Sequence, residues 1–427
     1  MRIAQIHTSD AGGGAEILAV AVHRALRQAG HDSRLWVGRK QTDEEQVVEI
    51  SRRRGIPGLQ RLTRWVENQW GLENLYQPGF RDLARTFASD TDVVIVRGLT
   101  GAERFSDVGG LPAITRRFPT LLWMDEMWLM TGHCVFSLGC DRWTHGCGKC
   151  PDLSIYPALP HDGTRFNFFR KRRILKRCDL HVAGPSHYLI NQVATSPILN
   201  HFPRSVVPNG IDLQVFQPAN RSAIRAELGL PAQSALVMVG ANHLNSPYKP
   251  ARHAVNAINL AARRHNISAI LVGNSIAQIQ SELSVRSWAM PYTSDRALLA
   301  KYYQAADIFL LPAIEETYGL MAAEAMACGC CVVAYASGAL PELIDNDETG
   351  ILVERGNSTA LGEAIQALYA GPERIAQLGS AAASRARERF GFEKHVSGLL
   401  DLLHDVIAGR TDASATHRRP NPVPTHI

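Results

Sequence analysis

Two glutamates near residue 320 have a spacing that suits recognition of a phosphorylated, polyhydroxylated ligand. Glu316 and Glu324 are separated by seven residues, with Gly319 between them and a run rich in Ala and Met behind. The apolar segment 307–311 precedes them, so the pattern predicts strand, glycine turn and helix. The first N–H groups of a helix have no partner within it and attract anions, while carboxylates accept hydrogen bonds from hydroxyl groups. The pattern therefore predicts a site for a nucleotide diphosphate that carries a polyhydroxy group.

Strand-like and helix-like patterns alternate along the whole chain, which predicts an α/β fold with parallel sheets that hold these residues in place. A break near residues 195–205, before a second series opening at 205–208, predicts two Rossmann-like domains with a cleft between them. Ligands of such sheets bind outside the carboxyl ends of the strands. The expected strands are 2–8, 34–38, 92–97, 120–124 and 180–184, and then 236–240, 268–273, 307–311, 331–336 and 351–354.

Three motifs together resemble the retaining family 4 glycosyltransferases of the GT-B fold. They are the Glu-x7-Glu pair, the segment Pro-Asn-Gly-Ile-Asp at 208–212, and the loop 337–343, where Ala339 replaces the family's second glycine. The resemblance covers most of residues 1–408. It implies transfer of a sugar from a nucleotide-diphosphate sugar to a hydroxyl acceptor, without a catalytic metal ion. Two surface carboxylates on an ordinary helix would be the alternative for the pair alone.

The same resemblance implies roles for individual residues. Glu316 would contact the sugar near its anomeric carbon, Glu324 would bind the ribose, and Lys249 would contact the pyrophosphate. Pro250 stands where the family usually has glycine, so a solvated loop lysine is the alternative for Lys249. The remaining donor-binding candidates are Gly319, Leu320 and Met321 around the phosphate, and Gly13 and Gly14 after the first strand, where tight strand–helix packing is the alternative.

Residues 125–134 resemble a subgroup common in exopolysaccharide and lipopolysaccharide gene sets. That subgroup carries His-Asp-Met-Trp followed by Thr-Gly-x-Cys, whereas here Asp125 stands at the histidine and Glu126 at the aspartate. We expect Asp125 to accept the acceptor's proton or to orient its hydroxyl. Alternatively, the departing phosphate oxygen takes the proton. Glu126 could equally have a structural role at the end of its strand.

Four cysteines in a segment poor in secondary structure suggest a metal. Their spacing, C-x5-C-x6-C-x2-C, is typical of a tetrahedral Zn²⁺ site, which would cross-link an insertion at 127–165. Two disulfides, buried thiols or an iron–sulfur cluster are the alternatives, and His133 or His145 could replace one ligand. The candidate ligands are Cys134, Cys140, Cys147 and Cys150; we expect Cys178, Cys328, Cys330 and Cys331 to be packing residues.

Length and composition set further bounds. The chain has 427 residues, 45% of them apolar, and a net charge of +5, which indicates a globular protein of more than one domain with no nucleic-acid-binding module. We expect an acceptor domain at 1–200, a nucleotide-sugar domain at 201–390, a helix crossing back at 391–408 and a disordered tail at 409–427. The N-terminus does not read as a signal peptide and no long apolar run is present, which predicts a cytoplasmic protein.

A basic and aromatic segment at 51–70 suggests contact with a membrane. It opens with three arginines at 52–54 and continues with Arg61, Arg64, Trp65 and Trp70 around helical apolar positions. Such a segment suits an anionic surface on the cytoplasmic face of the inner membrane, where a polyprenyl-linked acceptor would lie. An amphipathic helix covering its own sheet is the alternative.

The function expected from the sequence is therefore a glycosyltransferase of bacterial surface polysaccharide synthesis, with a saccharide or lipid-linked acceptor. A nucleotide-sugar epimerase on the same fold and a non-catalytic nucleotide-sugar-binding protein remain as alternatives. A glycoside hydrolase would also use two carboxylates, but across an open sugar cleft and without a nucleotide site.

Overall fold

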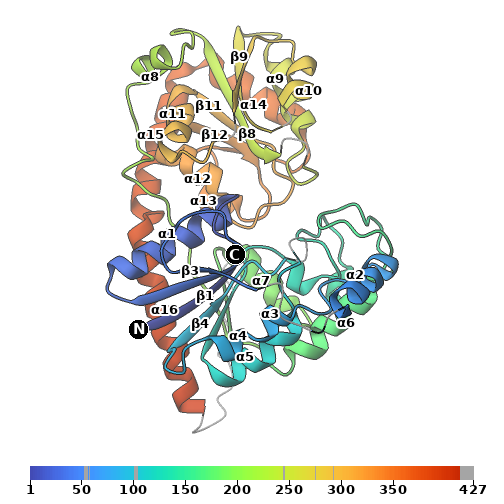
Figure 1. Ribbon diagram of the computed structural model, residues 1–427. Helices are drawn as coiled ribbons and strands as arrows, with labels where there is room; N and C mark the ends of the chain where they lie inside the picture. The colour runs from blue at the N-terminus through green and yellow to red at the C-terminus, as the bar shows by residue number, and fades with distance from the viewer. Residues whose placement is uncertain are drawn as a thin grey trace. The chain divides into compact units, whose positions relative to one another are not determined.

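The computed structural model describes residues 1–51, 56, 58–100, 104–243, 246–274, 276–291 and 293–413. The chain forms two compact units, each built on one parallel sheet (Figure 1). Unit 1 comprises Met1–Pro185, Leu189–Val207 and the chain from Val396 onward; unit 2 comprises Ser186–Tyr188 and Pro208–His395.

Unit 1 contains a seven-stranded sheet in the order β3-β2-β1-β4-β5-β6-β7. Its central strands β4 and β5 are buried along their whole length, as expected for parallel strands covered on both faces. The strands are β1 (Arg2–Ser9), β2 (Asp32–Arg39), β3 (Val47–Glu49), β4 (Val93–Val96), β5 (Thr120–Trp123), β6 (His181–Gly184) and β7 (Arg204–Val206). The helices are α1 (Gly14–Gln28), α2 (Leu59–Trp70), α3 (Pro78–Arg81), α4 (Leu83–Thr86), α5 (Leu111–Arg117), α6 (Thr164–Leu175) and α7 (His187–Thr195).

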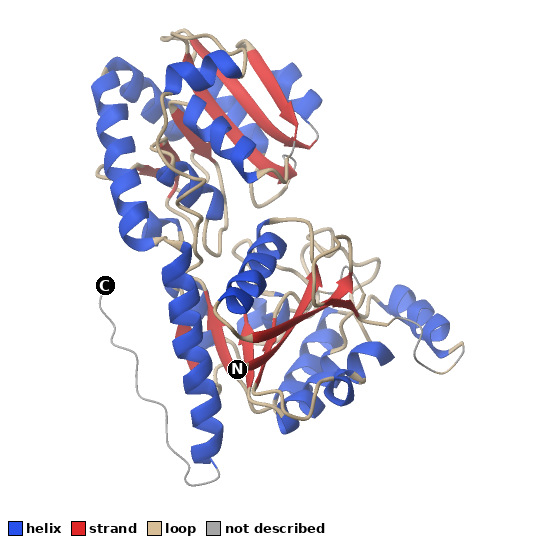
Figure 2. Cartoon of the chain, turned by 60° about the vertical axis from the view of Figure 1, so that its left-hand side comes forward, coloured by secondary structure: helices blue, strands red, loops and turns tan. Residues whose placement is uncertain are grey.

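Unit 2 contains a six-stranded sheet in the order β10-β9-β8-β11-β12-β13, with one buried apolar cluster on each face. Figure 2 shows the strands of both sheets flanked by helices. The strands are β8 (Ala235–His243), β9 (Ile267–Asn274), β10 (Ser287–Pro291), β11 (Ile308–Leu311), β12 (Cys331–Tyr335) and β13 (Ile351–Val353). The helices are α8 (Arg221–Glu227), α9 (Ala251–Ala261), α10 (Ile276–Glu282), α11 (Arg296–Ala305), α12 (Leu320–Ala327), α13 (Leu340–Leu343), α14 (Ser358–Ala370) and α15 (Pro372–Arg389).

Each expected strand is present within a few residues, and three further strands were missed. β3 and β7 have three residues each and β10 is a mostly exposed edge strand, so none carries a clear apolar pattern. The prediction that 205–208 opens the second series is wrong, because β7 pairs in parallel with β6 of the first sheet.

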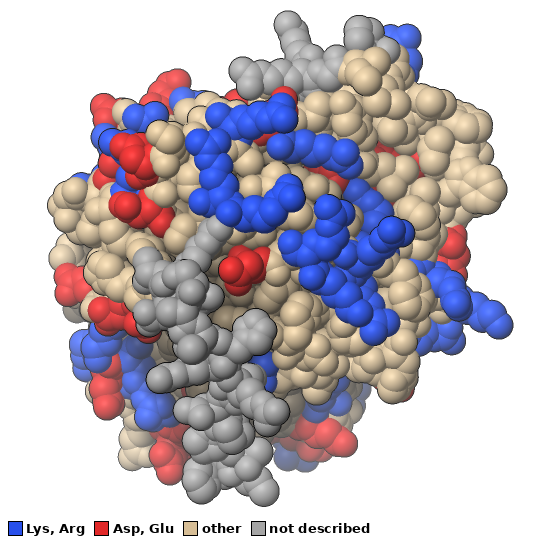
Figure 3. Space-filling model, turned by 90° about the horizontal axis from the view of Figure 1, so that it is seen from below, with Lys and Arg blue, Asp and Glu red and all other residues tan. Residues whose placement is uncertain are grey.

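The last helix, α16 (Phe392–Ala413), begins in unit 2 and continues in unit 1. It extends past residue 408, where we expected it to end. The rest of the expected tail, 414–427, and Arg52–Arg54 lie outside the described residues. None of the described helices combines the length with the apolar character that a membrane-spanning helix needs. Lysine and arginine side chains gather side by side on one face of the molecule (Figure 3).

Candidate functional site

The strand order of unit 2 reverses next to its first strand. β8 lies between β9 and β11, so the connections that leave β8 and β11 run to opposite sides of the sheet. Such a switch point leaves a crevice at the carboxyl ends of the two strands, where ligands of open α/β sheets bind. Lys249 follows β8 and Glu316 follows β11, so the topology alone brings these two predicted residues to the same edge.

Side-chain contacts confirm that the two loops are adjacent. Lys249 Nζ lies 2.7 Å from Glu316 Oε2, and the two side chains are 24% and 12% exposed. They form an ion pair whose geometry is not that of a hydrogen bond. The Ile314 N–H donates to the carbonyl of Tyr248 at 2.6 Å and ties the loops together. A lysine and a carboxylate held in contact at a switch point can serve an anionic, hydroxylated ligand together.

The third motif, in the loop 337–343, holds Glu316 in place. The Ala339 N–H donates to the Glu316 carbonyl at 2.9 Å. Gly338 has φ +55°, and a Cβ there would lie 2.1 Å from the Glu316 carbonyl oxygen, so the close approach requires glycine. Ala339, which replaces the family's second glycine, has φ −85° and is tolerated. This loop is therefore a backbone support for the site.

The start of α12 is available to an anion. Gly319, its N-cap residue, has φ +101° and no side chain caps the helix. By helix geometry the N–H groups of Leu320 and Met321 have no partner within the helix. The Met321 side chain packs against the end of β8, where a Cβ on Gly240 would lie 2.7 Å from its methyl carbon. The helix start and the β8 end are thus in contact.

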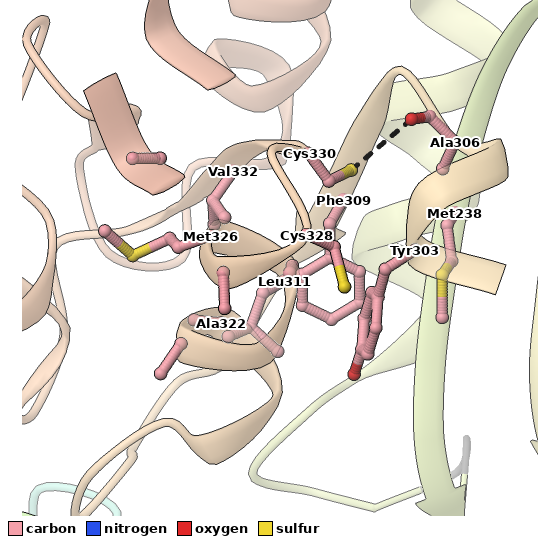
Figure 4. Packing of buried hydrophobic residues seen from close by; sticks show 14 of the residues in the cluster. Met238, Tyr303, Ala306, Phe309, Leu311, Ala322, Met326, Cys328, Cys330 and Val332 are labelled. Carbon is pink, nitrogen blue, oxygen red and sulfur yellow. Dashed lines mark hydrogen bonds between the residues drawn. The ribbon is translucent and has the colours of Figure 1, made fainter. Parts of the chain in front are cut away.

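Glu324 lies inside α12 and is only 3% exposed. It accepts hydrogen bonds from Arg296 Nη2 at 2.7 Å and from the Tyr303 hydroxyl at 3.1 Å. Burial raises the pKa of Glu324, and the Arg296 charge works against that rise. Tyr303 belongs to the apolar cluster under α12, which includes Cys328 and Cys330 as the predicted packing residues (Figure 4). This packing fixes the helix that carries Glu324.

Arg296 is a site residue that sequence reasoning missed. It begins α11, and its guanidinium lies 4.6 Å from the ring centroid of Phe216. Its side chain reaches Glu324 from a helix that begins some 50 residues after β8 ends, so no pattern around Lys249 or Glu324 points to it. The only signal in the sequence is Asp295, a helix-capping residue next to it, which predicts the helix start and not the contact.

Unit 1 has its own switch point, between β1 and β4. Arg97 follows β4 and Asp125 follows β5; two bonds of 2.7 and 2.8 Å join the guanidinium to the carboxylate. The Trp123 indole also donates to Asp125, at 3.1 Å. Both carboxylate oxygens of Asp125 already accept hydrogen bonds from these partners, so this geometry favours an orienting role for Asp125 over proton acceptance.

Two further polar residues lie near this pair and were not predicted. His7 on β1 is 1% exposed, and neither ring nitrogen has a hydrogen-bond partner among the described residues. Burial, with Arg97 nearby, lowers the pKa of His7 to about 4, so the ring is neutral. Glu16 lies in the first turn of α1, where burial raises its pKa. In the sequence, His7 lies in a strand pattern and Glu16 in a helix pattern, and such patterns predict packing residues and not site residues.

Gly13 and Gly14 form the start of α1. Gly13 is the N-cap residue in an extended conformation, and its Cβ position lies 3.3 Å from Glu16 Oε2. The absence of side chains leaves room for the Glu16 carboxylate beside the helix start. Donor contact by these two glycines stays a prediction.

Glu126 has the environment of a structural residue. Its carboxylate accepts hydrogen bonds from the Thr100 hydroxyl and from the Trp128 N–H, and burial raises its pKa to about 7. Lys171 lies 3.5 Å from the Trp128 ring centroid and donates to the Trp128 carbonyl at 2.8 Å. These contacts fix the segment that follows β5.

The four clustered cysteines are free thiols that line one small cavity of about 30 Å³ together with His133. The Gly132 N–H donates to Cys147 Sγ, and His133 Nε2 lies 3.4 Å from Cys150 Sγ. In the described residues, however, no group of three or more His, Cys, Asp or Glu side chains is arranged to hold a metal ion. Zinc binding by Cys134, Cys140, Cys147 and Cys150 therefore stays a prediction.

Part of unit 2 is similar to a known protein family. Residues 233–371 match the family model of the group 1 glycosyl transferases. The match lies within unit 2 and includes Lys249, Glu316 and Glu324. Over these residues, unit 2 therefore resembles the group 1 glycosyl transferases.

Relatives in sequence are named D-inositol 3-phosphate glycosyltransferases. The protein of Xylanimonas cellulosilytica is 32% identical over 230 residues, which cover 50% of this chain and 52% of the relative. That of Segniliparus rotundus is 33% identical over 216 residues, which cover 48% and 47%. The chain thus spans about half the length of the curated relatives that it matches.

Solved structures agree over nearly the whole chain. Sucrose-phosphate synthase from Thermosynechococcus elongatus has a TM-score of 0.71 at 21% identity and covers 96% of this chain and 99% of its own. Anabaena HepE in complex with UDP-glucose has a TM-score of 0.68 at 18% identity, covering 95% and 100%. WaaG, a glycosyltransferase involved in lipopolysaccharide biosynthesis, has a TM-score of 0.64 at 14% identity, covering 97% and 100%. These likenesses confirm the expected α/β fold of GT-B type.

Proposed function

We propose that this chain is a retaining glycosyltransferase that moves a sugar from a nucleotide-diphosphate sugar to a hydroxyl acceptor. The observation that carries the proposal is the contact between Lys249 and Glu316 at the switch point of unit 2, within the residues that match the group 1 glycosyl transferases. A cation and a helix start bind a pyrophosphate, and a carboxylate accepts hydrogen bonds from sugar hydroxyls, so together these groups suit a pyrophosphate-linked sugar better than a neutral ligand.

The proposed chemistry assigns each group a task. The start of α12 and Lys249 stabilise negative charge that develops on the pyrophosphate as the bond to the sugar breaks. Glu316 then accepts hydrogen bonds from sugar hydroxyls. Arg296 holds the buried Glu324 carboxylate in position, so that it can accept hydrogen bonds from the ribose.

Retention follows most simply if the departing phosphate oxygen removes the acceptor's proton on the same face of the sugar. The bidentate pair with Arg97 leaves Asp125 poorly suited to that task, so we assign it to orienting the acceptor. Glucose on UDP is the first donor to test, because HepE has been solved in complex with it.

The acceptor has two candidates. A saccharide or polyprenyl-linked saccharide of bacterial surface polysaccharide synthesis agrees with the motif at 125–134 and with WaaG as a structural neighbour. An inositol phosphate agrees with the names of the sequence relatives. Both present hydroxyl groups as nucleophiles.

The test measures UDP release from UDP-glucose with each acceptor class, and NMR assigns the anomeric configuration of the product. We expect acceptor-dependent release with retention, and a loss of at least ~100-fold in kcat/KM for Lys249→Ala and Glu324→Ala. Lys301→Ala, which removes only the surface ion pair with Glu227, is the matched control and should keep full activity.

Other results would support the alternatives. Interconversion of nucleotide-sugars without any acceptor indicates an epimerase. Tight donor binding with no turnover on any acceptor indicates a non-catalytic binding protein. Product with inverted configuration contradicts the proposed mechanism while leaving glycosyl transfer intact.

A further inference from the structure

Helix α2 has its apolar side chains on the outside. Leu62, Trp65 and Trp70 are 56%, 58% and 65% exposed, whereas the one residue of the helix that is buried is Glu67. The Glu67 carboxylate accepts a hydrogen bond from the Leu75 N–H at 2.7 Å and so helps to hold the helix to its unit. An ordinary surface helix buries its apolar face and exposes its charges. α2 exposes three large apolar side chains as well as its arginines, and a helix that merely covers its own sheet would bury those apolar side chains.

Helix α6 adds to the same apolar surface. Phe166 and Phe169 are 51% and 40% exposed. Between the two helices lies an open groove of about 810 Å³, whose apolar lining consists of Val66, Trp70, Leu72, Phe166, Phe169 and Ile174. A contiguous apolar patch of this kind marks a surface for a partner or a membrane.

Arginines border the groove. Arg165 and Arg173 of α6 line it and are exposed, and the Arg165 guanidinium lies 5.6 Å from the Phe169 ring centroid. Arg170 also lines it but is bound to Asp107. The exposed residues Arg61 and Arg64 of α2, and Lys176 and Arg177 after α6, extend the positive charge. Asp162 is the single acidic residue of the lining.

We propose that α2 and α6 form a docking surface for an anionic phospholipid bilayer. Tryptophan and phenylalanine side chains would insert at the level of the headgroups, and the arginines around them would bind lipid phosphates. Basic residues close to an anionic membrane are attracted to it, and apolar insertion adds to that attraction. A second copy of this chain fits less well, because it would bring two arginine-rich faces together.

This inference extends the proposed function by placing the enzyme where a lipid-linked acceptor is found. The two can fail separately. Membrane docking is measured without any turnover, and glycosyl transfer to a water-soluble acceptor is measured without any membrane.

The experiment sediments the full chain with vesicles of phosphatidylcholine alone, or of phosphatidylcholine mixed with phosphatidylglycerol. We expect binding to the mixed vesicles, weakened by high salt, together with a blue shift of tryptophan fluorescence. Two double variants, Trp65→Ser/Trp70→Ser and Arg165→Glu/Arg173→Glu, should each lose about tenfold or more in binding. The control Arg263→Glu/Arg264→Glu reverses two exposed charges after α9 in unit 2 and should bind as the unmodified chain does.

Three results would overturn the proposal. The first is equal binding with and without the anionic lipid. The second is equal weakening by the control and by the α6 variant while circular dichroism shows all variants folded. The third is self-association of the full chain that the tryptophan variant abolishes, which would assign the surface to a second copy.

Discussion

At the scale of single residues, the candidate site depends on charges that are neutralised in pairs. Lys249 pairs with Glu316, Arg296 with Glu324, and Arg97 with Asp125. A carboxylate removed from water stays ionised only when a cation or hydrogen-bond donors compensate it. The arginine and lysine partners supply such a cation, although burial still raises the pKa of Glu324. Glu126 has no cation in direct contact among the described residues, and its pKa rises to about 7.

The raised pKa of Glu126 leads to a prediction about stability and pH. Between pH 4.5 and about 7 the folded chain holds a proton on Glu126 that the unfolded chain has lost. Its contribution therefore makes the free energy of unfolding fall as pH rises through this window, by up to about 3 kcal/mol, and then level off. Glu126→Gln cannot ionise, so its stability relative to the unmodified chain should improve from pH 5 to pH 8.

Urea unfolding of both proteins at the two pH values measures this difference. Other buried acids, such as Glu73, affect both proteins alike and cancel in the comparison. An unchanged difference between the proteins at pH 5 and pH 8 would mean that Glu126 titrates normally.

At the scale of elements, a loop and a packed helix fix the positions of the two glutamates of the candidate site. The loop with Gly338 fixes the backbone of Glu316, and the packed underside of α12 fixes Glu324. A left-handed conformation costs a residue with a side chain about 1–2 kcal/mol, and steric overlap adds to that cost.

Gly338→Ala should thus destabilise the chain more than Gly356→Ala. Both glycines have positive φ, but a Cβ at Gly356 meets nothing within 4 Å, whereas one at Gly338 overlaps the Glu316 carbonyl. We expect the difference in free energy of unfolding to exceed ~1 kcal/mol. Donor affinity should also fall in Gly338→Ala alone, as isothermal calorimetry with UDP-glucose would measure. Equal effects of the two substitutions would show that the loop does not support Glu316.

The segment 127–165 is the second element with a testable property. Elemental analysis of the purified chain should find about one zinc ion per chain, and a chelator should lower the melting temperature. Cys147→Ser/Cys150→Ser should lose the metal, while Cys178→Ser, outside the cavity, should keep it. Metal-free protein that folds and melts like the untreated sample would refute the zinc prediction.

At the scale of the whole molecule, each unit repeats one plan, a parallel sheet whose strand order reverses beside its first strand. The plan gives each unit a polar edge: Lys249 and Glu316 in unit 2, and Arg97 and Asp125 in unit 1. Candidate site residues therefore lie in both units, and each unit has its own core.

A donor that binds the folded chain should stabilise unit 2 by mass action. At a hundred times its dissociation constant, UDP or UDP-glucose should add about 2.7 kcal/mol to the free energy of unfolding and raise the melting temperature. Lys249→Ala should remove the shift at the same ligand concentration, whereas Lys301→Ala should retain it. A shift that survives Lys249→Ala would place the nucleotide elsewhere.

The order of the elements, the main strands and the motif that pairs Glu316 with Glu324 could all be predicted from the amino-acid sequence, because local periodicity and the positions of glycines are properties of neighbouring residues. The contact of Arg296 with Glu324, the contact of Arg97 with Asp125 and the place of β7 in the first sheet became visible in the folded chain alone. Those facts join residues far apart in the chain, and no local pattern encodes such distances. The exposure of the apolar side chains of α2 could not be predicted either. A periodic pattern shows which residues share a face of a helix, but the folded structure is needed to show whether that face is buried or exposed.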